Sequence, residues 1–533
     1  MTNKKLSAWD ISTLFVTIPV ALPIIVVLTA LFSVQTDIWN HLLTTVLGDY
    51  LRNTLLLMFA VGVLSLLIGV PTAWLTARYQ FPGSRLFPVL LMLPLAAPAY
   101  VVGYVYADLL DYTGPLQTLL RGWGISELPP IRSLTGAALV IAFVLYPYIY
   151  LLARVSFSQQ AINHIEAART LGAGSSRVFF KVVLPMARPA IFGGLALVLM
   201  ETVADYGVVE HYGVQTFTTG IFRTWFAMGE PQGALQLAGC LFVIAAILVT
   251  LEDISRRGQT TNPVKPTPSK PLILRTWKGW LAFLICTVPV VIGFVVPMTS
   301  LFWDAIMAGD SMGAVELMAL MGNTLLVASI AAFCCLIAAV WLSYAARRTD
   351  HPLVRTGIRI ATLGYAIPGM VLAVGLLEPL TALDRGLATA VLETTDINIG
   401  LVISGSLTGL VLVYMARFLT VAFNNVQSSL LQINRRYDEV ASTLGAGSVR
   451  ILQRVHLPLL RPGMAAALLI VLVDVIKELP ATLVLRPFNF DTLATRVYRL
   501  ASDERLAEAS IAAILIVLLG LLPTILLSRT LKR

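Results

Sequence analysis

The chain has 533 residues, of which 57% are hydrophobic and only 13% charged, and its net charge is +9. Its mean hydropathy of +0.82 lies far above the range of soluble globular domains, which excludes that class. The apolar residues gather in blocks of roughly 20, the length of a membrane-spanning helix, and do not alternate over about 10 residues as barrel strands do. The composition and these blocks therefore predict an all-α, polytopic membrane protein with about 12 transmembrane helices. Each half has six blocks, and an even number of spans predicts two parallel six-helix repeats.

The first half of the chain, residues 1–253, is predicted to form one repeat. Its six apolar blocks lie at residues 12–33, 52–77, 86–108, 133–156, 189–208 and 233–251. The first block follows Lys4 and Lys5, but it is too long for a signal peptide and has no small-residue cleavage site. We therefore expect it to remain as a membrane helix.

A polar stretch separates the fourth block from the fifth. Residues 162–171 carry apolar side chains at helical spacing, which predicts a short amphipathic helix, and Gly172 follows as a helix-terminating glycine. The small Ala167 and Ala168 beside Glu166 leave room for the surface of another protein to approach. A helix that lies on the bilayer has the same pattern, so one copy does not separate docking from lipid contact.

A linker and a second set of blocks follow. Residues 254–278 are rich in Pro, Thr, Ser and Lys, which suits an extended cytoplasmic tether. The second repeat, residues 279–533, is predicted to have spans at residues 279–303, 322–346, 356–380, 398–421, 463–484 and 508–528. Alternate connecting segments hold most of the Lys and Arg, as in the linker, whereas the others hold acids such as Asp111 and Glu127. This positive-inside distribution predicts that both termini are cytoplasmic, and it explains the net charge without nucleic acid.

The two halves repeat each other at a nearly constant offset. Asn53-Thr54-Leu55-Leu56 corresponds to Asn323-Thr324-Leu325-Leu326, and Pro98 corresponds to Pro368. The stretch from Glu166 to Gly174 corresponds to that from Glu439 to Gly447, and each is followed by Leu-Pro at the same distance. We call residues 166–185 and 439–458 the first and second motif segments. Their recurrence favours docking over lipid contact.

The fifth block of each half carries ionisable groups, which are costly inside a membrane. The first half has Glu201 and Asp205 on one helix face, and the aligned positions of the second half are Asp474 and Glu478, with Lys477 between them. Paired acids in corresponding helices predict a polar translocation path along these five residues. The alternative is structural, with Lys477 neutralising the two neighbouring acids.

The motif segments resemble the cytoplasmic loop signature of ABC importer permeases: Glu-Ala-Ala, three residues, Gly, nine residues, a β-branched residue, one residue, Leu-Pro. The first segment fits fully, and the second departs only at Val440. The resemblance implies that each segment is a coupling helix seated in a groove of an ATPase, with contacts at Glu166, Ala167, Ala168, Gly172, Glu439, Ala441 and Gly445. The chain has no Gly-x-x-x-x-Gly-Lys-Ser/Thr loop, so we expect no enzyme activity and no cofactor of its own, with ATP and Mg bound by two copies of a separate cytoplasmic ATPase.

Longer strings narrow the resemblance to the fused, two-repeat permeases of ferric-iron importers. These strings run from Glu201 to Thr216 and from Lys477 to Pro487. The resemblance implies a bacterial inner-membrane permease that moves Fe(III), with a periplasmic or extracellular iron-binding protein docking on its outer loops. The outer segments 209–232 and 485–507 have a polar, aromatic composition that suits such docking and equally suits plain loops. Hard cations prefer oxygen ligands, so we expect transient Fe(III) contacts at Glu201, Asp205, Asp474 and Glu478. We expect no stable metal site.

Other functions remain open at this stage. The same machine with thiamine, a phosphonate or another small solute as cargo would share the architecture. A proton-coupled secondary transporter would also use buried acids, but it would need neither docking helices nor an ATPase. An intramembrane enzyme is disfavoured, because no Ser in the spans has a neighbouring His or Asp in the sequence that marks it as a nucleophile.

Overall fold

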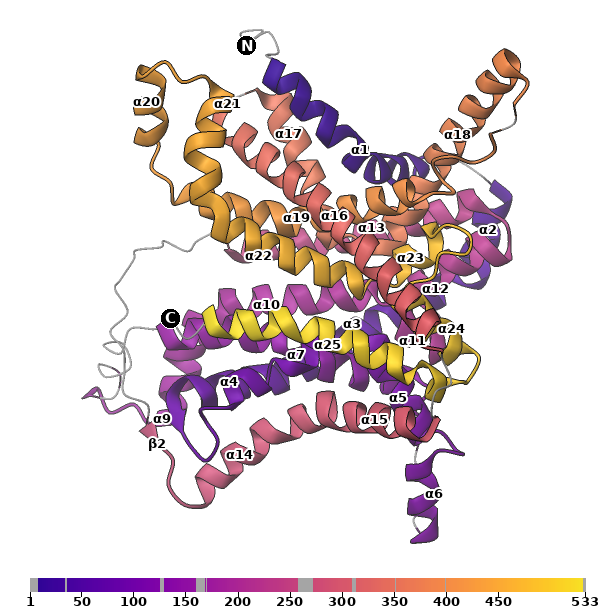
Figure 1. The fold of residues 1–533 in the computed structure, drawn as a ribbon. Coiled ribbons are helices and arrows are strands. Elements are labelled where there is room, and N and C mark those ends of the chain that lie inside the picture. Colours follow the sequence, from indigo (N-terminus) through magenta and orange to yellow (C-terminus); the bar gives the residue numbers. More distant parts are fainter. Residues whose placement is uncertain are drawn as a thin grey trace. The chain divides into compact units, whose positions relative to one another are not determined.

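The computed structural model describes residues 8–33, 36–124, 129–159, 168, 170–256, 272–308, 313–349, 351–397 and 399–530. Within these ranges the chain is almost wholly helical, as predicted (Figure 1). The only sheet in this part pairs β1 (Tyr79–Gln80) with β2 (Leu272–Ile273) in parallel. The chain divides into two compact units: unit 1 comprises residues 1–40, 220–242 and 312–496, and unit 2 comprises residues 41–219, 243–311 and 497–533.

Nine helices of the described residues are long and apolar enough to cross a membrane, and a bent pair makes a tenth. This confirms the polytopic class, but the number is lower than the predicted 12. The predicted third span, 86–108, bends by 87° between Phe87–Ala96 and Ala99–Gly122. The predicted ninth span, 356–380, is divided among α17 (Pro352–Ala361), a 3₁₀ turn (Gly364–Ala366) and α18 (Gly369–Thr395).

Proline explains both breaks. Pro98 and Pro368 lie immediately before α5 (Ala99–Leu110) and α18, and each has extended backbone angles. Proline cannot donate the backbone hydrogen bond that a continuous helix would require, so the helix before it ends. The predicted correspondence between Pro98 and Pro368 is thus a shared break in the backbone.

Unit 1 is built around three mutually packed helices, α16 (Ala314–Arg348), α19 (Leu407–Leu431) and α22 (Leu457–Ile476). Small buried residues of α16, such as Ala328, Ala331 and Ala332, let its neighbours approach closely. Helix α1 (Ala8–Ala30) packs on α17 and α18. In this unit, α20 and the C-terminal end of α18 lie at opposite ends (Figure 1). The shorter elements include α20 (Arg436–Thr443), α21 (Ser448–Ile451), a π-helix (Leu452–His456), α23 (Pro480–Leu485) and the start of α13 (Pro231–Arg256).

Unit 2 has an equivalent packed trio, α3 (Leu47–Arg78), α7 (Leu134–Gln159) and α10 (Leu184–Ala204). Gly194 of α10 lies so close to α7 that an added Cβ would come within 2.7 Å of the Ile149 Cα, so only glycine fits there. The other elements of this unit include α4 (Phe87–Leu90), a 3₁₀ turn (Leu93–Ala96), α6 (Pro115–Gly122), α9 (Ser175–Val178), a π-helix (Phe179–Val183), α11 (Gly207–His211), α14 (Trp277–Val290), α15 (Val296–Ala308) and α25 (Leu506–Thr530). Like α13, the helices α2 (Thr36–Thr45), α12 (Phe217–Phe222) and α24 (Leu493–Ser502) cross unit boundaries.

The compact units do not follow the two halves of the sequence. Helix α1 comes from the first half but packs in unit 1, whereas α14, α15 and α25 come from the second half and belong to unit 2, where α15 packs on α25. The predicted linker lies mostly outside the described residues, since 257–271 are not among them. The division into repeats at 1–253, 254–278 and 279–533 therefore stays a prediction about the sequence.

Candidate coupling and translocation sites

The second motif segment forms a short exposed helix followed by a sharp turn. Glu439 and Ala441 lie on α20, and Gly445 ends it with a φ of +78°, a left-handed conformation that suits glycine. The Ala446 amide then donates to the Ala441 carbonyl across 3.0 Å, which satisfies a carbonyl at the end of the helix. Just before this glycine, the apolar Leu444 is 82% exposed.

The first motif segment has the same geometry wherever it is described. Glu166 and Ala167 lie outside the described residues, as does most of the predicted helix at 162–171. Gly172 has a φ of +80°, the Ala173 amide donates to the Ala168 carbonyl across 3.0 Å, and Leu171 is 87% exposed. Gly172 therefore has the left-handed conformation expected of a glycine that ends a helix, while the predicted helix itself stays a prediction.

The resemblance between the two segments continues into the membrane helices. The π-helices Phe179–Val183 and Leu452–His456 differ by the same 273 residues that separate Glu166 from Glu439. Single-turn π-helices are rare and often occur at functional sites. Two further π-helices, Arg223–Ala227 and Val291–Val295, lie outside the motif segments, so what these two share is their equivalent position just before the Leu-Pro of each segment.

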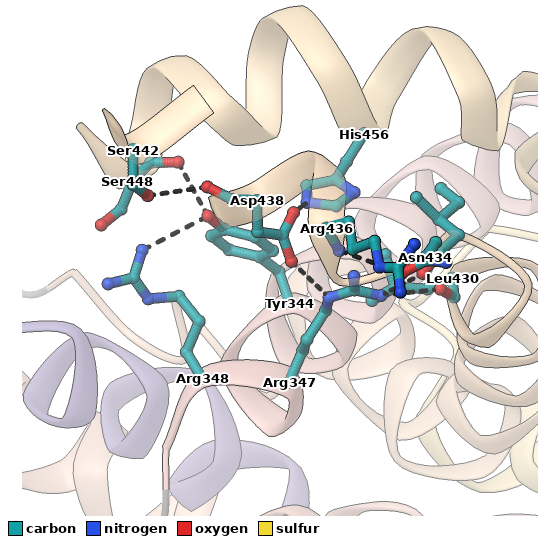
Figure 2. Close-up of polar contacts among 11 residues, drawn as sticks. Tyr344, Arg347, Arg348, Leu430, Asn434, Arg436, Asp438, Ser442, Ser448 and His456 are labelled. Carbon is teal, nitrogen blue, oxygen red and sulfur yellow. Dashed lines mark hydrogen bonds and ion pairs between the residues drawn. The ribbon is translucent and has the colours of Figure 1, made fainter. Parts of the chain in front are cut away.

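A partly buried polar network holds the second motif segment to its unit (Figure 2). Arg347, at the end of α16, donates from Nε to Oδ2 of Asp438 on α20 across 2.8 Å. Its Nη1 donates to the carbonyls of Leu430 and Ile433 at 2.9 and 3.0 Å. His456 Nε2 lies 2.6 Å from the other Asp438 oxygen, and the His456 side chain is fully buried. Sequence analysis did not identify this network.

Neighbouring side chains extend the network along the same helices. The Tyr344 hydroxyl of α16 donates to the Ser448 carbonyl at the start of α21 across 2.9 Å, and Arg348 Nη1 donates to that hydroxyl across 3.4 Å (Figure 2). Ser442 donates to the Asp438 carbonyl within α20 across 2.8 Å. The last turn of α16 therefore contacts α20 and α21 and, through Asp438, the π-helix.

In unit 1, the predicted path residues lie in ion pairs. Lys477 Nζ is 2.8 Å from Asp474 Oδ1, as the structural alternative expects. Glu478 pairs with Arg417 Nη1 at 2.8 Å and also accepts the Ala481 amide at 3.2 Å, at the break between α22 and α23. Arg417 was missed, although it is the one charged residue in the predicted span 398–421 and such a residue requires a partner.

In unit 2, Asp205 occupies the equivalent break. Helix α10 ends at Ala204, and Asp205 Oδ1 accepts the amides of Val208 and Val209 at 3.1 and 3.2 Å, which caps α11. Glu201 is half-buried on α10. Asp205 and Glu478 therefore share a local role, since each caps a short helix where the predicted span breaks. Among the described residues, no group of three or more His, Cys, Asp or Glu is placed to hold a metal ion.

The segments after these breaks are anchored alike in both units. In unit 2, Asn53 Nδ2 donates to the Gln215 carbonyl across 3.0 Å, and in unit 1 Asn323 Nδ2 donates to the Asp491 carbonyl across 3.2 Å. The adjacent threonines accept equivalent amide bonds, Thr54 from Phe217 and Thr324 from Leu493. The predicted correspondence of these asparagine and threonine residues is thus a correspondence of structure.

Comparison with known proteins supports this reading of the geometry. A family model described as the binding-protein-dependent transport system inner membrane component matches residues 3–257 and 336–533, which is most of the chain and includes both motif segments.

Individual relatives match either nearly the whole chain or about two fifths of it. The Fe(3+)-transport system permease protein FbpB 2 of Haemophilus influenzae is 26% identical over 491 residues, which cover 91% of this chain and 90% of the relative. The molybdenum transport system permease protein ModB of Escherichia coli K12 is 30% identical over 217 residues, 39% of this chain but 93% of the relative. The sulfate transport system permease protein CysT of Salmonella typhimurium is 29% identical over 199 residues, 37% of this chain and 71% of the relative. The chain belongs to the family of binding-protein-dependent transport system inner membrane components, as a form with two permease repeats in one polypeptide.

Proposed function

We propose that this permease forms the membrane path of an ATP-driven importer that moves Fe(III) across the bacterial inner membrane by alternating access. Its partners are two copies of a cytoplasmic ABC ATPase, which bind ATP and Mg, and a periplasmic or extracellular iron-binding protein. Both termini lie in the cytoplasm. The observation that carries the proposal is the exposed leucine followed by a left-handed glycine that both motif segments contain, at Leu171-Gly172 and at Leu444-Gly445.

The exposed leucines support docking on another protein. Leu171 and Leu444 are 87% and 82% exposed, and each directly precedes a left-handed glycine. A large apolar side chain exposed at a fixed position within a turn is typical of a contact that a partner covers. Two such contacts in one chain match two ATPase subunits. A proton-coupled transporter has no use for them.

The charges near the helix breaks support a cationic cargo. In unit 1, Asp474 and Glu478 are balanced by Lys477 and Arg417, so this set is neutral when all four are ionised. In unit 2, Glu201 and Asp205 add carboxylates that suit a hard cation through their oxygen atoms. One relative that matches the chain along nearly its whole length is named an Fe(3+)-transport system permease protein.

An oxyanion is the second candidate cargo, because the relatives of single-repeat length carry molybdenum or sulfate in their names. Cells that lack this chain, with and without its restoration, would be supplied with radiolabelled ferric iron, molybdate or sulfate. An uncoupler that collapses the proton gradient but spares ATP would be present. The proposal predicts restored uptake of iron alone. Restored uptake of molybdate or sulfate instead of iron would show that the cargo is an oxyanion. Uptake that the uncoupler abolishes would exclude an ATP-driven mechanism.

A further inference from the structure

The polar network on the second motif segment has an apolar counterpart in the first half of the chain. Two offsets relate the halves here: 273 residues from Glu166 to Glu439 in the motif segments, and 270 residues from Asn53 to Asn323 in the preceding helices. The resulting pairs are Asp438 with Ile165, His456 with Val183, and Arg347 with Ala77. All three charged or titratable groups are thus replaced together.

Two of the three pairs occupy the same place in the backbone. His456 and Val183 are each the last residue of a π-helix, and both are fully buried. Arg347 and Ala77 each lie near the end of the long helix that comes first in the packed trio of its unit. The third aligned position, Ile165, lies outside the described residues. The Arg347 and His456 side chains are 9% and 0% exposed, which is costly for polar groups without polar neighbours, and the Asp438 carboxylate lies beside both of them.

The guanidinium of Arg347 joins three elements at one point. It belongs to α16, binds the carbonyls of Leu430 and Ile433 at the end of α19, and binds Asp438 of α20. The rigid fork of an arginine fixes all of these bonds in one geometry, and its bond to a carboxylate is among the stronger hydrogen bonds. His456 connects the same carboxylate to the π-helix that leads into α22.

We propose that Arg347, Asp438 and His456 are positioning residues that clamp the second motif segment to α16, α19 and α22. Displacement of α20 by the ATPase is then transmitted to the membrane helices through the contacts of these three side chains, whereas the aligned positions of the first half carry Ile165, Val183 and Ala77. The functional part of this inference rests on the proposed ATPase contact. The position of α20 does not, and it is tested separately.

The first test measures hydrogen exchange of the purified chain in lipid nanodiscs. Asp438→Asn removes the shared carboxylate, and Arg436→Ala is the matched control because it removes an exposed charge from the same helix. The clamp predicts that the α20 amides exchange at least about tenfold faster in Asp438→Asn, with α17 unchanged and the control close to wild type. Arg347→Lys, which keeps the charge but not the fork, should lie between wild type and Arg347→Ala.

The second test measures ATP hydrolysed per ion transported by the complex with its ATPase. Asp438→Asn should raise this ratio severalfold, and Arg436→Ala should not. The inference is overturned if Asp438→Asn and Arg436→Ala give the same exchange rates and the same ratio. If Asp438→Asn does not fold, the α20 exchange rates of Arg347→Lys are used instead. Rates in Arg347→Lys that equal those of the wild type would overturn the clamp. Failure of the wild type to transport iron would refute the proposed cargo and leave the exchange result standing.

Discussion

Arg417 donates from Nη1 to Oε1 of Glu478 across 2.8 Å, and the two side chains are 8% and 6% exposed. They connect α19 to the break between α22 and α23 within unit 1. In the first half, the position aligned with Arg417 through the motif offset is Val144, so Asp205 has no equivalent arginine. The break after α22 therefore combines a carboxylate cap with an ion pair, whereas the break after α10 has a carboxylate cap and no arginine at the aligned position.

Removal of one member of this pair should be more harmful than removal of both. Arg417→Met leaves Glu478 buried without its cation, and breaking a buried pair costs about 3–5 kcal/mol. The double change Arg417→Met and Glu478→Leu removes both charges and should unfold closer to wild type. Thermal unfolding in detergent checks this order. Equal stability of Arg417→Met and wild type would contradict it, and a stable double variant that fails to transport would place the pair on the translocation path.

Gly369 provides the space that the pair occupies. A Cβ at Gly369 would collide with Arg417 Nη1 and Glu478 Oε1, so Gly369→Ala should lower the stability by about 1–3 kcal/mol. Gly386, on the same helix α18, offers a control because a Cβ there meets nothing within 4 Å. Gly386→Ala should be neutral or slightly stabilising, since alanine favours a helix. The account fails here if the two variants unfold at the same temperature.

The turn before α19 should weaken in acid. Asp384 is buried and accepts hydrogen bonds from the Val402, Ile403 and Ser404 amides and from the Ser404 hydroxyl. Burial raises the pKa of Asp384, but these hydrogen bonds lower it by more, so the folded pKa lies below its ordinary value.

Because that pKa is depressed, the stabilisation is present above the ordinary aspartate pKa of about 3.9 and is lost as the pH falls through the lower, folded value. Hydrogen exchange at residues 402–404, followed from pH 6 to pH 3 and corrected for the intrinsic rate, should stay constant until about pH 4 and then rise. Asp384→Asn should exchange faster at pH 6 and lose this acid dependence. The same acid dependence in that variant would rule out Asp384 as the cause.

The exposed leucines of the motif segments should be needed for association with the ATPase. Leu171→Ala and Leu444→Ala together should weaken co-purification of the ATPase about tenfold or more, because apolar anchors at an interface contribute about 1–2 kcal/mol or more each. Leu353→Ala, at an exposed leucine of α17 outside the motif segments, is the control. Co-purification that is equally strong in the double variant and the control would refute docking through these side chains.

Sequence patterns predicted the helices well because apolar length decides whether a helix can cross a membrane. They did not predict where the spans break, since Pro98 and Pro368 interrupt helices that hydropathy alone shows as continuous. The composition of the two units could not be predicted either. The apolar surface of α1 is equally compatible with helices of either half, and only tertiary packing selects α17 and α18.

The site was predictable where it repeats and not where it differs. The glycines at 172 and 445 were identifiable because both halves have them, and both are left-handed. The Arg347–Asp438–His456 network was missed because its members are far apart in sequence and absent from the other half. Comparison of the aligned positions would have shown the charge differences, but not that three helices bring those charges together.

The central claim is that the two motif segments transmit the ATP-driven movement of the ATPase to the membrane path. It is tested most directly by the double variant Glu166→Ala and Glu439→Ala, reconstituted with the ATPase and the iron-binding protein in proteoliposomes. The account predicts that the variant inserts at the wild-type level but loses ATP-dependent iron uptake. Uptake at the wild-type rate in that variant would contradict it.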